Sequence, residues 1–137
     1  MYRVTREIQF CYGHRLLEYD GKCRYLHGHN GRAVITLAAP ELDRLGMVVD
    51  FSRLKRVVGH WIDETIDHKM LLHKDDPMLP FFRQQGEPVY VMDVNPTAEN
   101  IARLIFEYTA AQGFPVAKVQ LWETANCYAT YAGGREW

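Results

Sequence analysis

The stretch YLHGHNGRAVITLAA, residues 25–39, constrains the fold most strongly because it is long, rich in small and β-favouring residues, and ended by Pro40. It predicts a long β-strand. Residues 1–10, MYRVTREIQF, alternate apolar and polar side chains imperfectly and predict another strand. Between them, the polar loop at 18–22, EYDGK, holds an Asp-Gly turn signal. We therefore expect an antiparallel hairpin with a long connection.

Two segments have the pattern of amphipathic helices. In residues 46–66, Asp50 is a good N-cap residue, and apolar side chains follow at helical spacing. Residues 95–114 begin with Asn-Pro-Thr and reach Gly113, which suits a helix C-terminus. The apolar positions of the first segment are Phe51, Leu54, Val58, Trp61, Ile62 and Ile66.

The remaining segments complete an α+β pattern. Residues 70–95 read as irregular, with one short strand at 88–92, and residues 115–132 alternate as a closing strand region. The resulting order is β-β-α-(β)-α-β-β. It predicts an antiparallel sheet with the helices packed on one face.

Composition narrows the class of protein. The chain has 137 residues, which suits a single domain, 1–137, and 47% of them are hydrophobic. Its 16 basic and 17 acidic residues are interspersed, so the basic patch of a nucleic-acid binder is missing. The charged N-terminus and the absence of a long uncharged run predict a cytoplasmic protein without a membrane segment. With three cysteines and no secretory signal, free thiols are expected.

The His-Gly-His sequence at 27–29 suggests a metal site. Residues i and i+2 of a strand point to the same face, so His27 and His29 project together. His14 ends the predicted partner strand and can lie beside them. Three imidazoles on two strands suit a catalytic zinc site, which keeps its fourth position open. Two other interpretations stay open at this point: a solvent-facing pair of histidines, and a closed structural site with Cys23 as fourth ligand.

The cysteines differ in their surroundings. Cys23 lies between Lys22 and Arg24 in a polar loop, and neighbouring cations favour the thiolate that a reactive cysteine needs. Cys11 and Cys127 lie in apolar, strand-like contexts and are expected to fill the core.

Three acidic or basic side chains complete the candidate site. Asp67 and His68 follow the first predicted helix, where a carboxylate beside an imidazole can fix its tautomer and raise its basicity. Glu123 falls by alternation on the apolar side of its strand, where a carboxylate is costly unless it is paired. It therefore lies at the rim or binds a ligand, such as a planar heterocycle with an amino group beside a ring N–H.

The chain resembles the family of 6-pyruvoyl-tetrahydropterin synthase and 6-carboxytetrahydropterin synthase over essentially its whole length. The segments that carry the resemblance occur in the family's order and spacing: FCYGHRL, KCRYLHGHN, GMVVDF, DHKML, NPTAEN and LWET. The resemblance implies a T-fold, in which a four-stranded antiparallel sheet carries two helices on one side. It also implies a homohexamer, built as a dimer of trimers, with active sites at subunit interfaces.

The resemblance also implies roles for individual residues. The zinc ligands fall on His14, His27 and His29, and the catalytic cysteine falls on Cys23. The proton relay falls on Asp67 and His68. Glu123 matches the glutamate that anchors the pterin, and Thr97 falls near the same ring.

The implied reaction is the zinc-dependent conversion of 7,8-dihydroneopterin triphosphate to 6-carboxytetrahydropterin, acetaldehyde and triphosphate, which feeds queuosine and 7-deazaguanine synthesis. The alternative within the family is 6-pyruvoyl-tetrahydropterin synthase. An alternative of another class is a non-catalytic, zinc-stabilised pterin-binding protein. The sequence departs from the family at ANCY, residues 125–128, and at Cys11 and Tyr12, where small residues are common.

Overall fold

A long antiparallel hairpin forms the centre of the sheet. In a computed structural model, which describes residues 1–133, strand β1 spans Tyr2–His14 and strand β2 spans His27–Ala39. Their register runs from Tyr2 opposite Ala39 to His14 opposite His27. The connection carries a single 3-10 turn, η1 (Lys22–Arg24), and the Leu16 N–H donates to the Cys23 carbonyl at 2.8 Å. The predicted hairpin is therefore present, with the first strand extended to His14.

The sheet has six strands in the order β4-β3-β1-β2-β5-β6. Strands β5 (Val116–Trp122) and β6 (Tyr128–Tyr131) continue the antiparallel pairing beside β2. On the other side, β3 (Lys69–His73) pairs in parallel with β1, and β4 (Val89–Met92) pairs in parallel with β3.

The prediction of a four-stranded, wholly antiparallel sheet is wrong in this respect. The sequence does not predict strand β3, because Leu71 and Leu72 are both buried and its side chains therefore do not alternate between core and solvent. The closing segment turns after Trp122 and returns as β6, so the two strands at the end of the predicted order are present.

The first predicted helix is a continuous helical segment. It comprises α1 (Phe51–Leu54), a wider π-helical turn η2 (Lys55–Gly59) and α2 (His60–Thr65). Asp50 caps it as predicted, because its carboxylate accepts a hydrogen bond from the Ser52 N–H at 2.8 Å.

The second predicted helix is α4 (Ala98–Ala111), and Thr97 caps it by accepting from the Asn100 N–H at 3.1 Å. Gly113 follows with a φ of 90°, a left-handed conformation that suits glycine. A further short helix, α3 (Leu79–Gln84), precedes β4.

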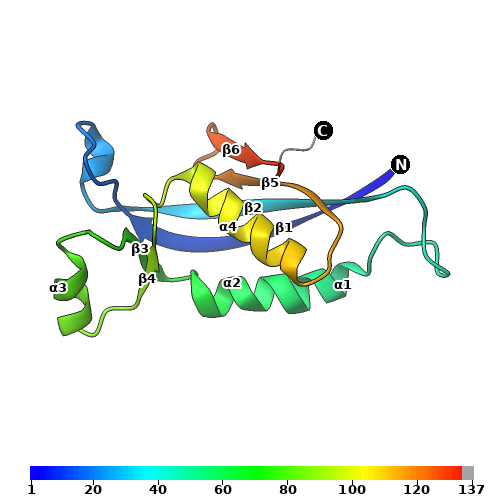
Figure 1. Cartoon of the computed structure of the whole chain (residues 1–137), viewed down its shortest axis with the longest axis horizontal. Coiled ribbons are helices and arrows are strands. Elements are labelled where there is room, and N and C mark those ends of the chain that lie inside the picture. Colours follow the sequence, from blue (N-terminus) through cyan, green and yellow to red (C-terminus); the bar gives the residue numbers. More distant parts are fainter. Residues whose placement is uncertain (134–137) are drawn as a thin grey trace.

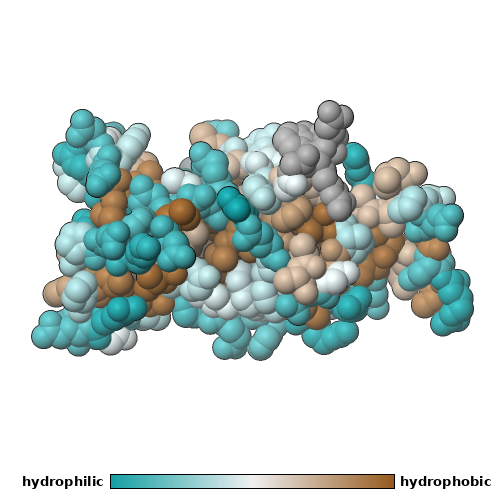
Figure 2. Space-filling view, viewed as in Figure 1, coloured by the Kyte–Doolittle hydropathy of each residue, from teal (hydrophilic) through white to brown (hydrophobic). Residues whose placement is uncertain are grey.

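Both long helical segments pack on the same face of the sheet, so the predicted α+β arrangement is confirmed (Figure 1). The rings of Trp61 and Tyr108 stack at 4.2 Å between them. Figure 2 shows a mainly polar surface with hydrophobic side chains visible between polar ones. No helix within residues 1–133 has the length and apolarity of a membrane span. The largest fully buried side chains include Ile35, Leu37, Leu54, Ile62, Leu71, Ile101, Ile105 and Leu121.

A buried ion pair fixes the end of β1. The Arg15 Nε donates to Asp76 Oδ2 at 2.7 Å, and the Asp76 side chain is fully buried. Burial alone would raise the pKa of Asp76, but hydrogen bonds from Arg15 and from the Met78 N–H lower it overall. The pair joins the residue after His14 to the turn that follows β3.

Substituting Asp76→Asn should lower the free energy of unfolding at pH 7 by about 3 kcal/mol, because it leaves the Arg15 cation without its partner. The folded-state pKa of Asp76 lies below its unfolded value, so this stabilisation is present above about pH 4 and is lost as the pH falls through the folded pKa. Urea unfolding at neutral and acid pH should show the two proteins converging in acid.

The matched control for this prediction is Glu7→Gln, which breaks the pair between Glu7 and Arg32. Those side chains are 50% and 35% exposed, so we expect a loss of less than about 1 kcal/mol. Equal losses from the two substitutions would contradict the assigned role of Asp76.

Tyr12 carries a polar atom into the core. It is 3% exposed, and among the described residues its hydroxyl is the buried side-chain polar atom that has no hydrogen-bond partner. Gly31 leaves room for the ring, since a Cβ there would lie 2.9 Å from it. Burial, and then the charge of Glu123, raise the pKa of Tyr12, so the phenol remains neutral.

Removing this hydroxyl by Tyr12→Phe should raise the free energy of unfolding by about 1 kcal/mol, because it relieves the cost of an unpaired buried group. Urea unfolding of the metal-free protein measures the change. Tyr2→Phe, at a position that is 50% exposed, should have almost no effect. Destabilisation by Tyr12→Phe would instead show that the hydroxyl has a partner in solution.

Candidate metal centre and active site

The structure brings together the three histidines that the sequence analysis selected. His14 lies directly opposite His27 in the hairpin, and His29 lies opposite Tyr12 on the same face. Their ring centroids are 4.5 to 5.1 Å apart, and one nitrogen of each ring lies within 4.8 Å of the others. We call these residues the histidine triad.

Backbone carbonyls orient two of the rings. The Nδ1 of His14 is 2.7 Å from the Pro96 carbonyl oxygen, and the Nδ1 of His27 is 2.7 Å from the Tyr25 carbonyl oxygen. A carbonyl oxygen only accepts, so each Nδ1 carries the proton and each neutral ring keeps a lone pair on Nε2. Metal-binding histidines are held in this way by acceptors behind them.

The electrostatics of the histidine triad favour neutral imidazoles. Burial lowers the pKa of His14 to about 4, and the neighbouring His27 and His29 contribute in the same direction. Burial also lowers the pKa of His29, against the opposing charge of Glu123. Three imidazoles on rigid strands fit a divalent metal that accepts nitrogen ligands and retains an open coordination position.

Glu123 lies beside the histidine triad, immediately after β5. Its Oε2 is 3.1 Å from the His29 Nε2, and its side chain is 23% exposed. The Glu123 N–H donates to the Cys127 carbonyl at 3.1 Å, which closes the turn between β5 and β6. A cavity of about 460 Å³ lies between this turn and the start of α4, and its lining includes Glu123 and Cys127. Glu123 is therefore partly exposed at the rim of the core, which is one of the two positions expected from the sequence.

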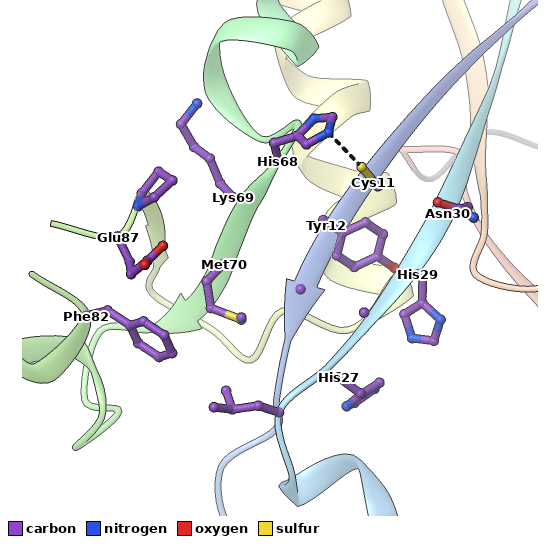
Figure 3. A pocket seen from close by; sticks show the side chains of 14 residues that line it. Cys11, Tyr12, His27, His29, Asn30, His68, Lys69, Met70, Phe82 and Glu87 are labelled. Carbon is purple, nitrogen blue, oxygen red and sulfur yellow. Dashed lines mark hydrogen bonds between the residues drawn. The ribbon is translucent and has the colours of Figure 1, made fainter. Parts of the chain in front are cut away.

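Asp67 and His68 form a second cluster with Cys11. Figure 3 shows the contact between His68 and Cys11. The His68 Nδ1 is 2.9 Å from Asp67 Oδ2, and its Nε2 is 3.3 Å from the Cys11 Sγ. The Cys11 N–H donates to Asp67 Oδ1 at 2.9 Å. Burial alone would raise the pKa of Asp67, but these hydrogen bonds and the neighbouring imidazole lower it overall.

The prediction that Cys11 and Cys127 fill the core is wrong. Cys11 is partly exposed, and Cys127 is exposed in the turn between β5 and β6. Cys11 alternates with Phe10 and Tyr12, which face the core, so its side chain points to the opposite face of the sheet. An apolar sequence context does not show which face of a strand is covered. All three cysteines are free thiols, as expected.

Cys23 and Thr97 belong to backbone segments that contact the end of β1, but neither side chain is part of the histidine triad or of the cluster of Cys11, Asp67 and His68. Cys23 is in η1, held to the end of β1 by the bond from Leu16. Within residues 1–133, its thiol makes no hydrogen bond to the triad or to His68. Thr97 caps α4 and follows Pro96, whose carbonyl orients His14.

Sequence reasoning missed the parts of the site that are built from the backbone. The segment NPTAEN predicts a helix start, and the resemblance places its Thr97 near the pterin. Neither indicates that the Pro96 carbonyl accepts from His14, or that the Asn95 side chain hydrogen-bonds to both the N–H and the carbonyl of Leu17. Every residue has a backbone carbonyl, so the residue types in a sequence do not indicate which carbonyl accepts a hydrogen bond from a histidine. The pairing of Arg15 with Asp76 likewise joins residues that are far apart in the sequence.

Comparison with known proteins identifies the family of the chain. The sequence profile of the family described as 6-pyruvoyl tetrahydropterin synthase matches residues 3–134. A curated relative from Rickettsia conorii, named 6-carboxy-5,6,7,8-tetrahydropterin synthase, is 41% identical over 135 residues, which are 93% of this chain and 98% of that protein.

Two solved structures have the same fold. An uncharacterized protein from Wolinella succinogenes superposes with a TM-score of 0.80 at 28% identity, covering 96% of this chain and 98% of that one. The 6-pyruvoyl tetrahydropterin synthase of Caenorhabditis elegans gives 0.72 at 28% identity, with 97% and 96% covered. The resemblance seen in the sequence is thereby confirmed, and the chain belongs to the 6-pyruvoyl tetrahydropterin synthase family.

Proposed function

We propose that the protein is a zinc-dependent 6-carboxy-5,6,7,8-tetrahydropterin synthase that acts on 7,8-dihydroneopterin triphosphate. The observation that carries the choice of product is the 41% identity, over nearly the whole chain, to relatives with that name. The convergence of the histidine triad beside Glu123 supports a metal-assisted reaction at this place in the fold.

The histidine triad would hold the zinc ion. Zinc bound there would supply Lewis acidity toward the hydroxyl oxygens of the substrate side chain. The carbonyls of Pro96 and Tyr25 keep His14 and His27 in the tautomer that such binding needs. The low pKa of His14 means that protons compete with a metal for this ring only in acid.

Glu123 and Thr97 are the proposed pterin contacts. The Glu123 carboxylate can accept two hydrogen bonds from an amino group and an adjacent ring N–H. It borders the cavity of about 460 Å³, whose other wall includes the first residue of α4, Ala98. The Thr97 hydroxyl accepts from the helix as a cap, so its own proton stays available as a donor.

Cys23, Asp67 and His68 are the proposed proton-transfer groups. Asp67 fixes the His68 tautomer, so that Nε2 can accept or return a proton. Because Cys23 makes no hydrogen bond with His68 in one chain, we propose that Cys23 and the Asp67–His68 pair meet across an interface between copies. This is consistent with a homohexamer, and the edge strands β4 and β6 offer places for such copies to pair.

The wider assignments follow from the same proposal. The chain acts as one domain in the cytoplasm, on a small pterin triphosphate, with a role in queuosine and 7-deazaguanine synthesis and without nucleic-acid or membrane partners. The predicted domain, 1–137, includes four residues that lie outside the described range.

A second candidate function is that of 6-pyruvoyl-tetrahydropterin synthase. It is favoured by the description of the matching family and by the likeness to the C. elegans enzyme. The same residues would then have the same roles, and only the fate of the substrate side chain would differ.

The metal assignment predicts that the chelator-treated protein binds one zinc ion per chain, and that His29→Ala weakens this binding by at least about 100-fold, because one of three ligands is lost. Isothermal titration with zinc chloride measures both affinities. The control is His60→Ala, which removes an exposed imidazole from α2. Equal affinities for the two variants would exclude the histidine triad as the site.

The reaction is tested by mass spectrometry of products after incubating the zinc-loaded protein with 7,8-dihydroneopterin triphosphate. We expect 6-carboxytetrahydropterin and acetaldehyde, whereas 6-pyruvoyl-tetrahydropterin would establish the second candidate. Cys23→Ala should reduce turnover by at least about 100-fold because a proton-transfer group is lost. Its zinc content should be unchanged. Loss of zinc instead would indicate a structural site with Cys23 as a ligand, and full turnover would remove Cys23 from the mechanism.

A further inference from the structure

Cys11, His68 and Asp67 are arranged as a nucleophile, a base and the group that orients the base. The Cys11 Sγ is 3.3 Å from His68 Nε2, and the opposite ring nitrogen, Nδ1, is 2.9 Å from Asp67 Oδ2. A carboxylate accepts only, so Nδ1 carries its proton and the Nε2 of the neutral ring faces the thiol as an acceptor. This is the geometry in which an imidazole activates a cysteine.

The backbone holds these three residues in place. The Cys11 N–H donates to Asp67 Oδ1 at 2.9 Å, and the His68 N–H donates to the Cys11 carbonyl at 2.7 Å. His68 has a φ of 59°, a left-handed conformation that is uncommon outside glycine. Such a conformation is retained where the surroundings enforce it. Here the two hydrogen bonds connect the residues that follow α2, Asp67 and His68, to Cys11 of β1.

The cluster opens onto a cavity of about 590 Å³, whose lining also includes His27 and His29 of the histidine triad (Figure 3). Gly13 and Gly28 contribute no side chains to its floor, and Met70 and Phe82 form an apolar wall. The His68 side chain is 77% exposed. In the single chain, the cavity therefore gives a small molecule access to the Sγ, beside a base that can take the thiol proton.

We propose that Cys11 is a covalent modification site for small soft electrophiles. In the reaction, the Sγ forms a bond to the electrophilic carbon, and the leaving group departs with its electron pair. The thiol proton passes to His68 Nε2. For an α-halo amide, the products are the S-alkyl cysteine, the halide ion and the protonated imidazole. The inference shares Asp67 and His68 with the proposed pterin chemistry, but the reaction at Cys11 requires neither zinc nor the pterin substrate, so it is tested separately.

If exposure alone controlled the rate of alkylation, Cys127 would react faster than Cys11, so the two thiols can be compared in one experiment. Cys127 is exposed, whereas Cys11 is only partly exposed and lies beside a base. The folded protein is treated with limiting iodoacetamide at pH 7 for increasing times, then unfolded, labelled with a heavy reagent and digested with trypsin. Cys11 and Cys127 fall in separate peptides, residues 7–15 and 119–135. Their light-to-heavy ratios give two rates from one sample.

We expect Cys11 to react about 10-fold faster than Cys127 or more, which is a modest contribution for a positioned base. His68→Asn should bring the Cys11 rate to that of Cys127 or below and leave the Cys127 rate unchanged. Asparagine tolerates a positive φ, so this variant preserves the backbone, and circular dichroism checks its fold. Faster labelling of Cys127 in the parent protein, or a Cys11 rate unaffected by His68→Asn, would overturn the proposal.

Discussion

The pairing of His14 with His27 in the central hairpin is the constraint on which the candidate site depends. It places the end of β1 opposite the start of β2, so that three imidazoles from two strands share one face. Side chains alternate along a strand, so a slip of one residue would turn His27 and His29 to the other face while His14 remained. The alternating core positions of the same strands, such as Ile35 and Leu37, oppose that slip because it would expose them.

The segment before α4 completes what the hairpin begins. Asn95 bonds the backbone of Leu17, Pro96 accepts from His14, and Thr97 starts the helix. These three consecutive residues thus hold the loop after β1, fix the tautomer of His14 and cap α4. The helix packs on the sheet through residues such as Ile101 and Ile105, so core packing is transmitted to the orientation of a buried imidazole.

The two faces of β1 carry different chemistry. The side chains of Tyr12 and His14 are buried on the core side, whereas Cys11 points to the other face and contacts His68. The cavity at Cys11 is also lined by His27 and His29. The thiol that the sequence singled out, Cys23, lies instead in the loop between the strands. The thiols of Cys11 and Cys23 therefore lie in different environments. His68 contacts Cys11, which the sequence predicted to be a core residue.

The sequence by itself determined the hairpin, both long helices with their caps at Asp50 and Thr97, and the grouping of His14, His27 and His29. Each of these follows from local periodicity or from spacing within paired strands. The sequence also predicted the strand at 88–92, which is β4, but only the tertiary structure decided strand β3 and the parallel pairing of β3 with β1 and β4. Strand β3 shows no alternation because Leu71 and Leu72 are both buried. The tertiary structure also decided the partners of His14, Arg15 and Cys11, since a carbonyl acceptor, a distant carboxylate and the outer face of a strand depend on contacts between segments far apart in the chain.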